Sequence, residues 1–296
     1  MTKVLITGGA GFIGSNLAKV LNSMGHEVIT LDIKNIKKQN HIVADVTDKD
    51  ALKKACKGID YIFHLAAVTS PPEFLDPMSD SYRINVMGTY NVLAAGLSEG
   101  VKRVIIASSS SVYGNINTTA SEELLPKQYD NFYPLSKLIN ELTAKTFVKY
   151  GLETISLRYF NTYGMEKMKG KYSSVIWKFI DDIMNGRQPV IYGDGTQRRD
   201  FIYVDDVVRA TILAMDRGAP GEAYNVGTGI STSFNEVFRI VKELTGFRGE
   251  PIYVPNPYKS YQKFTRADTA KAKKELGFEA EYNIRAGVKK ILDELS

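Results

Sequence analysis

A short apolar run followed at once by three evenly spaced glycines stands at the start of the chain. Residues 4–6 are typical of a buried parallel strand, and glycines occupy positions 8, 11 and 14. From Ser15 onward, apolar residues recur at helical spacing. In a strand–turn–helix unit of this kind, Gly8 permits a tight turn and Gly14 lets the helix pack close to the strand. This stretch constrains the fold more than any other because it specifies two elements and the turn between them.

The same stretch has the features of a phosphate cradle. Gly11 lets a pyrophosphate approach the backbone, and the helix N-terminus supplies N–H groups and a partial positive charge. The predicted strand at residues 27–31 ends at Asp32, whose carboxylate can accept hydrogen bonds from ribose hydroxyls and repels a 2′-phosphate. A plain tight turn and a strand-end turn former are the alternatives, and the nearby residues Lys34, Lys37 and Lys38 leave NADP open. The pattern predicts a dinucleotide site that favours NAD.

Strands and helices alternate through the first half of the chain. Strands are predicted at residues 41–44, 60–65, 101–107 and 154–157, and helices at residues 49–57, 79–98 and 133–149. Beyond residue 163 the pattern predicts a helix at 172–184, strands at 188–192, 199–204 and 223–226, helices capped by Asp205 and by Ser233 with Glu236, and two final helices flanking Gly277.

This order predicts an α/β fold with a Rossmann-type doubly wound parallel sheet and a smaller C-terminal α/β substrate domain. Residues 1–163 and 203–226 form the predicted dinucleotide-binding domain. Residues 164–202 and 227–296 form the predicted substrate domain. Because the chain has no low-complexity linker, we expect the two parts to be interleaved and tightly packed.

Composition excludes several classes of protein. The 296 residues are 44% hydrophobic and 24% charged, and no apolar run reaches the roughly 18 to 20 residues that span a bilayer. Neither a signal peptide nor a pair of cysteines is present, so a cytoplasmic location is expected, with Cys56 as an idle thiol. The net charge of +5 comes from scattered lysines without a nucleic-acid motif, and the three histidines lack metal-ligand spacing.

Polar residues follow the predicted fifth strand. Serines occupy positions 108–111, at the sheet edge where open α/β folds bind ligands, although they could equally be helix caps. Tyr133 precedes Pro134 at a predicted helix start, and Lys137 lies one turn further along the same face. A free tyrosine has a pKa of about 10, and a nearby ammonium favours the phenolate. Tyr133 could then remove a proton from a substrate hydroxyl that Ser109 holds; the alternative is an ordinary surface helix start.

These motifs together resemble the extended, sugar-nucleotide-modifying branch of the short-chain dehydrogenase/reductase superfamily. The resemblance rests on the glycine turn, on His64-Leu65-Ala66-Ala67 with Asn85-Val86-Met87-Gly88-Thr89, on the serines before Val112-Tyr113-Gly114, and on Tyr133 with Lys137. It implies catalysis by Tyr133, Lys137 and Ser109. It also implies a cofactor site made of Gly8, Gly11, Phe12, Ile13, Gly14, Asp32, Asp45, Val46, Leu65, Ala66, Ala67, Asn85, Ser108, Tyr133, Lys137 and Tyr159. Without it, Asp45 would be a helix cap, and Ala66 with Ala67 plain packing.

The second half resembles nucleotide-sugar epimerases, most closely the UDP-glucose 4-epimerases. The matching stretches are Arg158-Tyr159-Phe160-Asn161 and the run from Gly193 to Ile202. The resemblance implies NAD as cofactor, a UDP-sugar as the nucleotide-diphosphate substrate, oxidation and re-reduction at C4, and a homodimer formed by the helices at 79–98 and 133–149. The implied substrate-binding residues are Ser109, Ser110, Tyr133, Asn161, Arg199 and Lys259.

Two departures keep other family reactions open. Tyr258 and Lys259 stand where those epimerases carry a second diphosphate-binding arginine, and residues 261–265 resemble ADP-heptose 6-epimerases. Sugar-nucleotide dehydratases have Thr-Asp-Glu where this chain has residues 109–111, so dehydration is disfavoured. A decarboxylase or a reductase remains an alternative. An NAD-binding sensor or scaffold without activity is another, against which the presence of Tyr133 and Lys137 argues.

Overall fold

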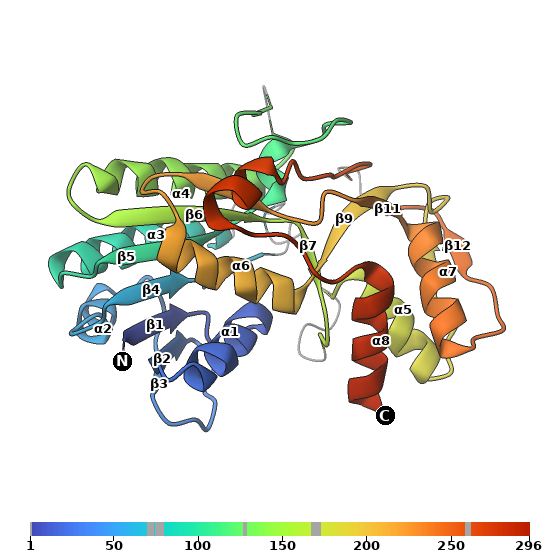
Figure 1. Cartoon of the computed structure of the whole chain (residues 1–296), viewed down its shortest axis with the longest axis horizontal. Coiled ribbons are helices and arrows are strands. Elements are labelled where there is room, and N and C mark those ends of the chain that lie inside the picture. The colour runs from blue at the N-terminus through green and yellow to red at the C-terminus, as the bar shows by residue number, and fades with distance from the viewer. Residues whose placement is uncertain (1, 70–73, 75–79, 127–128, 167–172, 258–261) are drawn as a thin grey trace.

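The computed structural model describes residues 2–69, 74, 80–126, 129–166, 173–257 and 262–296. Its largest layer is a seven-stranded sheet in the order β10-β6-β5-β4-β1-β2-β3, with every neighbouring pair parallel (Figure 1). The strands are β1 (Lys3–Thr7), β2 (Glu27–Asp32), β3 (His41–Val43), β4 (Tyr61–His64), β5 (Arg103–Ser109), β6 (Glu153–Tyr159) and β10 (Ala223–Val226). The predicted Rossmann-type doubly wound sheet is confirmed. The strand order reverses between β1 and β4, which is where such sheets bind ligands.

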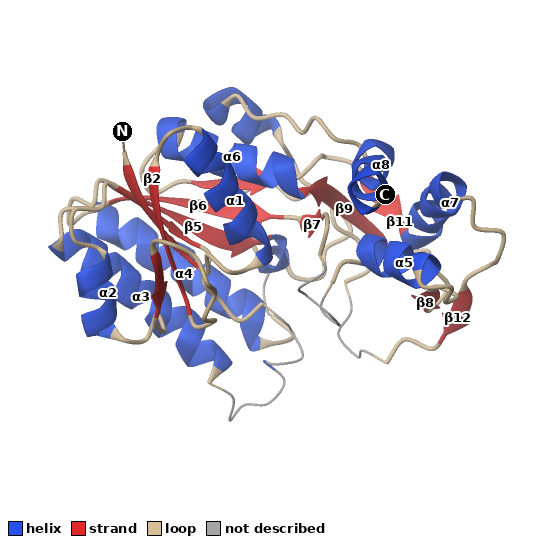
Figure 2. Cartoon of the chain, turned by 90° about the horizontal axis from the view of Figure 1, so that it is seen from below, coloured by secondary structure: helices blue, strands red, loops and turns tan. Residues whose placement is uncertain are grey.

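Helices cover both faces of this sheet (Figure 2). The helices α1 (Phe12–Ser23) and α6 (Val204–Arg217) lie on one face, and α2 (Lys49–Ala55), α3 (Ser81–Ser98) and α4 (Phe132–Val148) lie on the other. The prediction that Asp205 caps a helix is wrong: α6 already begins at Val204, and Asp205 lies in its first turn, where it pairs with Lys290 at 2.6 Å. Among the described residues, no helix combines the length and the apolarity needed to cross a membrane.

In the described residues, the C-terminal part adds two small sheets, three α-helices and a π-helix. One sheet has the order β11-β9-β7 and the other pairs β12 with β8. The elements are β7 (Asn161–Tyr163), α5 (Val175–Met184), β8 (Val190–Tyr192), β9 (Arg198–Tyr203), β11 (Ser231–Ser233), α7 (Phe234–Thr245), β12 (Ile252–Val254), a five-residue π-helix (Ala272–Leu276) and α8 (Ile284–Leu295). Ser233 and Glu236 form the predicted capping box on α7. β7, β11 and β12 were not predicted; β7 (NTY) and β11 (STS) contain no apolar run that would indicate a strand.

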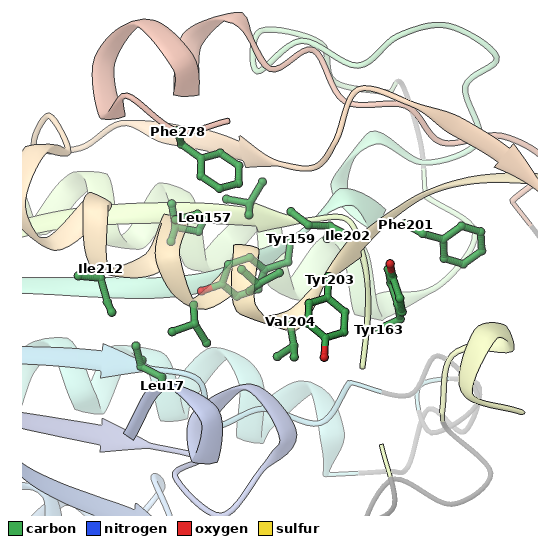
Figure 3. Close-up of a cluster of buried hydrophobic side chains, with 14 of the residues drawn as sticks. Leu17, Leu157, Tyr159, Tyr163, Phe201, Ile202, Tyr203, Val204, Ile212 and Phe278 are labelled. Atoms are coloured by element: carbon green, nitrogen blue, oxygen red, sulfur yellow. The ribbon is translucent and has the colours of Figure 1, made fainter. Parts of the chain in front are cut away.

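One hydrophobic cluster runs through both parts of the molecule. It includes Leu17 of α1, Tyr159 of β6, Ile202 of β9 and Phe278 beyond the π-helix (Figure 3). A second cluster fills the space between the sheet and α2, α3 and α4. The prediction of tight packing is confirmed, whereas the predicted domain boundaries remain a proposal.

Candidate active site

The glycine turn after β1 is shaped by close backbone contacts. Gly8 has φ +73°, and a Cβ there would lie 2.7 Å from the backbone nitrogen of Ala66. A Cβ on Gly14 would lie 2.2 Å from the carbonyl oxygen of Gly8, whereas one on Gly11 would meet nothing closer than 3.1 Å. Gly11 is the N-cap of α1, and no side chain caps this helix. A backbone-only turn at a helix N-terminus fits a pyrophosphate, as predicted for these glycines.

Asp32 stands at the end of β2, beside this turn. Its carboxylate accepts the N–H of Ala10 at 3.0 Å through Oδ2 and the N–H of Lys34 at 3.0 Å through Oδ1. These bonds hold the carboxylate at the edge of the cradle, and each oxygen keeps a second lone pair with which a ribose hydroxyl can bond. The geometry therefore suits the predicted contact with the adenine ribose.

Asp45 and Val46 follow β3. Asp45 accepts the N–H and the hydroxyl of Thr47, so it shapes a turn, while Asp48 is the cap of α2. Val46 is buried, and a Cβ on Gly88 of α3 would lie 2.6 Å from its Cγ2. The glycine thus lets α3 approach the predicted adenine-binding loop closely.

A fully buried histidine connects the ends of β1 and β4. His64 Nδ1 lies 2.7 Å from the hydroxyl of Thr7, and its Nε2 lies 3.0 Å from the hydroxyl of Thr89. Because Thr89 donates its proton to the carbonyl of Asn85 at 2.7 Å, it accepts from Nε2–H, and Nδ1 accepts from Thr7. Burial, and then the charge of Lys137, lower the pKa of His64 to about 3. The ring is therefore neutral and acts as a fixed hydrogen-bond link.

Asn85 extends this link toward α4. Its side chain accepts the N–H of Val68 at 2.8 Å, and donates to the carbonyl of Val68 at 3.0 Å and to the hydroxyl of Ser136 at 3.2 Å. Ser136 in turn donates to the carbonyl of Tyr133 at 2.7 Å. The predicted steadying role of Asn85 beside the cofactor therefore has a structural basis: Asn85 ties the loop after β4, next to Leu65, Ala66 and Ala67, to α4.

Tyr133, Ser109 and Lys137 meet at the carboxyl end of β5. Asn131 caps α4 through the N–H of Tyr133 at 3.0 Å, which fixes the helix start at the tyrosine. The Tyr133 hydroxyl interacts with the side chain of Ser109, whose Oγ accepts the N–H of Ser111 at 3.1 Å. Lys137 Nζ donates to the carbonyl of Ala107 at 2.9 Å and lies 6.0 Å from the centre of the Tyr133 ring.

Burial dominates the electrostatics of this group. Burial raises the pKa of Tyr133, and the interaction with the Ser109 side chain opposes that shift. Burial lowers the pKa of Lys137 to about 8, and the Glu141 carboxylate opposes that shift. The Tyr133 phenol lies near the Lys137 ammonium and the Ser109 hydroxyl. In this arrangement it can exchange a proton with an alcohol bound between Tyr133 and Ser109.

The other serines of this loop have different surroundings. The hydroxyl of Ser108 donates to Glu141, so it is already engaged, and the predicted cofactor contact of Ser108 remains open through its main chain. Ser110 is buried at the start of a short 3-10 helix, η2 (Ser110–Tyr113), and its predicted substrate contact is untested. Within the described residues, the buried hydroxyl of Ser111 has no hydrogen-bond partner.

The predicted diphosphate residues lie on adjacent strands. Asn161 opens β7, which pairs in parallel with β9, and Arg199 is the second residue of β9. Asn161 accepts the hydroxyl of Thr265 at 3.2 Å, and Thr265 accepts the backbone N–H of Asp200 at 3.0 Å. The Arg199 guanidinium donates to the carbonyl of Arg198 and lies 5.7 Å from the centre of the Phe234 ring. The Thr265 hydroxyl thus links Asn161 to the segment of β9 that carries Arg199.

Two further predicted residues need separate comment. The hydroxyl of Tyr159 lies 2.8 Å from that of Thr211 on α6, inside the core (Figure 3), so a cofactor contact of this residue would involve its main chain. Lys259, predicted for the diphosphate, and its neighbour Tyr258 lie outside the described residues. No cluster of metal-binding side chains occurs in the described part of the chain.

The sequence reasoning missed several buried polar groups around the site. His64 was considered only as a metal ligand, and Glu141 and the side chain of Arg158 were given no role. A signal for Glu141 was present: it stands four residues after Lys137 on a predicted helix, and therefore on the same face. No comparable spacing rule points to His64, because its partners Thr7 and Thr89 come from distant parts of the chain.

Comparison with known proteins agrees with this geometry. Residues 4–227 match the model of the NAD dependent epimerase/dehydratase family. A UDP-N-acetyl-alpha-D-glucosaminuronate decarboxylase from Bacillus cytotoxicus is 35% identical over 86% of the chain and 83% of its own length. A UDP-glucose 4-epimerase from Mycolicibacterium smegmatis is 30% identical over 98% of the chain and 97% of its own length.

Solved structures point the same way. The UDP-glucose 4-epimerase from Thermotoga maritima, determined with UDP-glucose, superposes with a TM-score of 0.92 at 31% identity, covering 99% of this chain and 98% of that one. The match therefore extends over both parts of the molecule. The chain belongs to the NAD dependent epimerase/dehydratase family, and NAD is its cofactor.

Proposed function

We propose that the protein is a UDP-glucose 4-epimerase, which interconverts UDP-glucose and UDP-galactose through a 4-keto sugar. The observation that carries the proposal is the meeting of the Tyr133 hydroxyl, the Ser109 hydroxyl and the Lys137 ammonium at the carboxyl end of β5. When bound, NAD would accept a hydride from the sugar carbon and return it, so that it is regenerated in each cycle.

The residues of the chain would handle the proton and the position of the sugar. Tyr133, as the phenolate, would take the proton from the 4-hydroxyl, and would return it to the 4-keto oxygen in the reverse step. Ser109 would hold that oxygen by a hydrogen bond. Lys137 would stabilise the phenolate and bind the nicotinamide ribose. Such a site would raise the rate by holding the sugar in the correct orientation between a proton acceptor and a hydride acceptor.

The substrate would extend from this centre toward the C-terminal part. Arg199 is a planar donor suited to a diphosphate, with Asn161 and Lys259 as further contacts. Hydroxyls at Ser110 and Ser111, in place of the acids of dehydratases, support epimerisation over loss of water. The epimerases among the similar proteins support UDP-glucose as the substrate.

A uronate decarboxylase is the second candidate, favoured by the Bacillus cytotoxicus relative at 35% identity. It would use the same oxidation at C4, after which a carboxylate at C5 leaves as carbon dioxide. The ADP-heptose 6-epimerase alternative also has a relative, at 31% identity over 99% of this chain, and the ADP-sugars of the assay test it.

The assay is conversion of UDP-glucose to UDP-galactose, followed without added cofactor and again with added NAD. Tyr133→Phe should lower kcat at least about a hundredfold, since general acid–base catalysis contributes about that much or more. UDP-glucuronate, UDP-N-acetylglucosamine and ADP-, GDP- and dTDP-sugars are tested in parallel. Release of carbon dioxide from a UDP-uronate without epimerisation of UDP-glucose would replace the proposal with the second candidate. Absence of bound NAD and of any turnover would favour the sensor alternative.

A homodimer is part of the proposal. The outer face of α3 and α4 exposes Met87, Tyr90, Phe132 and Leu142 by 42 to 57% of their surface. Such an apolar face on two packed helices suits a second copy of the same pair. Leu142→Glu should lower the molar mass measured by light scattering from that of a dimer to that of a monomer. A wild-type protein that is monomeric at micromolar concentration would contradict this assignment.

A cytoplasmic location also belongs to the proposal. Its support is a chain of 296 residues with a single cysteine, which cannot form an internal disulfide.

A further inference from the structure

Three side chains on one face of α4 engage three consecutive residues of β5. Tyr133, Lys137 and Glu141 stand at successive turns of the helix, and all three are buried. Tyr133 interacts with the side chain of Ser109, Lys137 donates to the carbonyl of Ala107, and Glu141 accepts the hydroxyl of Ser108. Glu141 is therefore the third member of the row that carries the two groups proposed for proton transfer.

A buried arginine compensates the charge of Glu141. Arg158 of β6 donates to the carboxylate from Nε at 3.0 Å and from Nη2 at 2.7 Å, and both side chains are less than 9% exposed. Arg158 also donates from Nη1 to the hydroxyl of Tyr113 at 2.9 Å and to the carbonyl of Glu122 at 2.8 Å. The carboxylate is thus held on three sides, and its position is fixed by α4, β5 and β6.

Stability alone does not explain this arrangement. A buried ion pair is often no more stabilising than apolar side chains of the same volume, because both charges lose their hydration. A role at the neighbouring reaction centre is a better explanation, since Glu141 lies one helical turn from Lys137, where side chains meet.

The charged groups around Lys137 leave Glu141 as its source of negative charge. On α4, Tyr133 is a neutral phenol until it ionises. Facing it from β4, His64 is neutral because burial lowers its pKa to about 3. Beyond Glu141, Arg158 of β6 is a cation, and burial raises the pKa of Tyr113 on η2, which keeps that phenol neutral. Removal of the carboxylate would leave Lys137 in a buried site next to a second cation.

We propose that Glu141 is a positioning residue of the catalytic centre, whose carboxylate, anchored by Arg158 and Ser108, keeps Lys137 charged and aligned beneath Tyr133. The inference rests on the proposed function, because it concerns the proton transfer assigned to Tyr133. Glu141 itself touches neither substrate nor cofactor in this scheme; it acts through Lys137.

The test is the pH dependence of kcat/KM in the wild-type protein and in Glu141→Gln. Loss of the carboxylate should lower the pKa of Lys137, weaken its hold on the phenolate, and move the acidic limb of the profile upward by about one pH unit. At pH values on the acidic limb, kcat/KM of Glu141→Gln should be about tenfold lower than that of the wild type, while the KM for the nucleotide sugar changes little. Glu141→Asp, which keeps the charge, should restore part of the shift.

A matched control is Glu153→Gln, which breaks another glutamate–arginine pair, Glu153 with Arg103 at 2.6 Å, at the opposite end of β5 and β6. Its pH profile should coincide with that of the wild type. If Glu141→Gln does not fold, Glu141→Gln with Arg158→Met also removes the arginine that would lose its carboxylate partner, and should shift the profile in the same direction by a smaller amount.

A second readout does not depend on turnover. The phenolate absorbance of the NAD-bound protein, minus that of the same protein with Tyr133→Phe, reports the ionisation of Tyr133 alone, and its midpoint should rise in Glu141→Gln. If the wild type converts no nucleotide sugar, the proposed function fails, and this titration still decides the inference. Coincident midpoints in wild type and Glu141→Gln would overturn it, whatever the activity.

Discussion

Acidification should destabilise the protein through His64. In the folded chain burial lowers the pKa of this ring to about 3, whereas an unfolded chain has the ordinary value of 6.5. The unfolded state therefore binds the proton first as pH falls. For a base with a depressed folded pKa, the full stability is present above the unfolded pKa and is lost progressively below it, down to about pH 3.

The size of the loss follows from the two pKa values. Each pH unit below the unfolded pKa costs about 1.4 kcal/mol, so the free energy of unfolding should fall by about 2 kcal/mol between about pH 8 and about pH 5 from this residue alone. The physical reason is that a charged ring carries a proton on Nδ1, so Thr7 could no longer donate to that nitrogen, in a site that excludes water.

Urea denaturation at a series of pH values measures this loss. Carboxylates also titrate in this range, so the quantity to compare is the difference between wild type and His64→Gln. The variant should be less stable than the wild type near neutral pH, and the gap should close by about 2 kcal/mol toward about pH 5. A gap that stays constant with pH would refute a neutral, buried His64.

Three further outcomes are expected. Gly14→Ala should lose bound NAD and more than about 2 kcal/mol of stability, since its Cβ would lie 2.2 Å from the carbonyl of Gly8; cofactor content and thermal unfolding measure both, and retained NAD would contradict the cradle. Asp200 is buried and accepts the N–H groups of residues 228, 229 and 267, so Asp200→Asn should cost about 3 kcal/mol in chemical denaturation, whereas Asp194→Asn, at an exposed turn, should cost less than about 1 kcal/mol. Burial raises the pKa of the Cys56 thiol to about 12, so a thiol reagent at about pH 8 should label the native protein much more slowly than the urea-unfolded one, and equal rates would contradict its burial.

The sheet was predictable from sequence because its strands are continuous apolar runs. Residues 4–6 and 104–106 are buried, and glycine or serine stands two positions after each run, so type and order could be predicted together. The predicted start of α6 was wrong because two local signals for a helix start compete there. Asp205 resembles a cap, but Val204 already has helical geometry, because the preceding strand β9 delivers the chain directly into α6.

The candidate site was predictable only in part. Tyr133 and Lys137 were identified since one helix brings them together, and Asp32 since it follows a strand. The groups that hold them were not. Arg158 reaches Glu141 across two elements, and Thr7 reaches His64 across neighbouring strands 57 residues apart in sequence. Such pairs depend on the assembled sheet, and no periodicity within a single segment encodes them.

The route of the chain through its two parts limits how the molecule can be divided. β10 and α6 complete the large sheet and cover it, yet both come after the first stretch of the C-terminal part. A fragment that stops at residue 163 would present the hydrogen-bonding edge of β6 to solvent, together with the apolar surface that α6 covers. Neither part can be produced alone by a single cut. Exchange of substrate-recognition modules between such proteins therefore requires three simultaneous junctions, one after β7 and one on either side of the segment that holds α6 and β10.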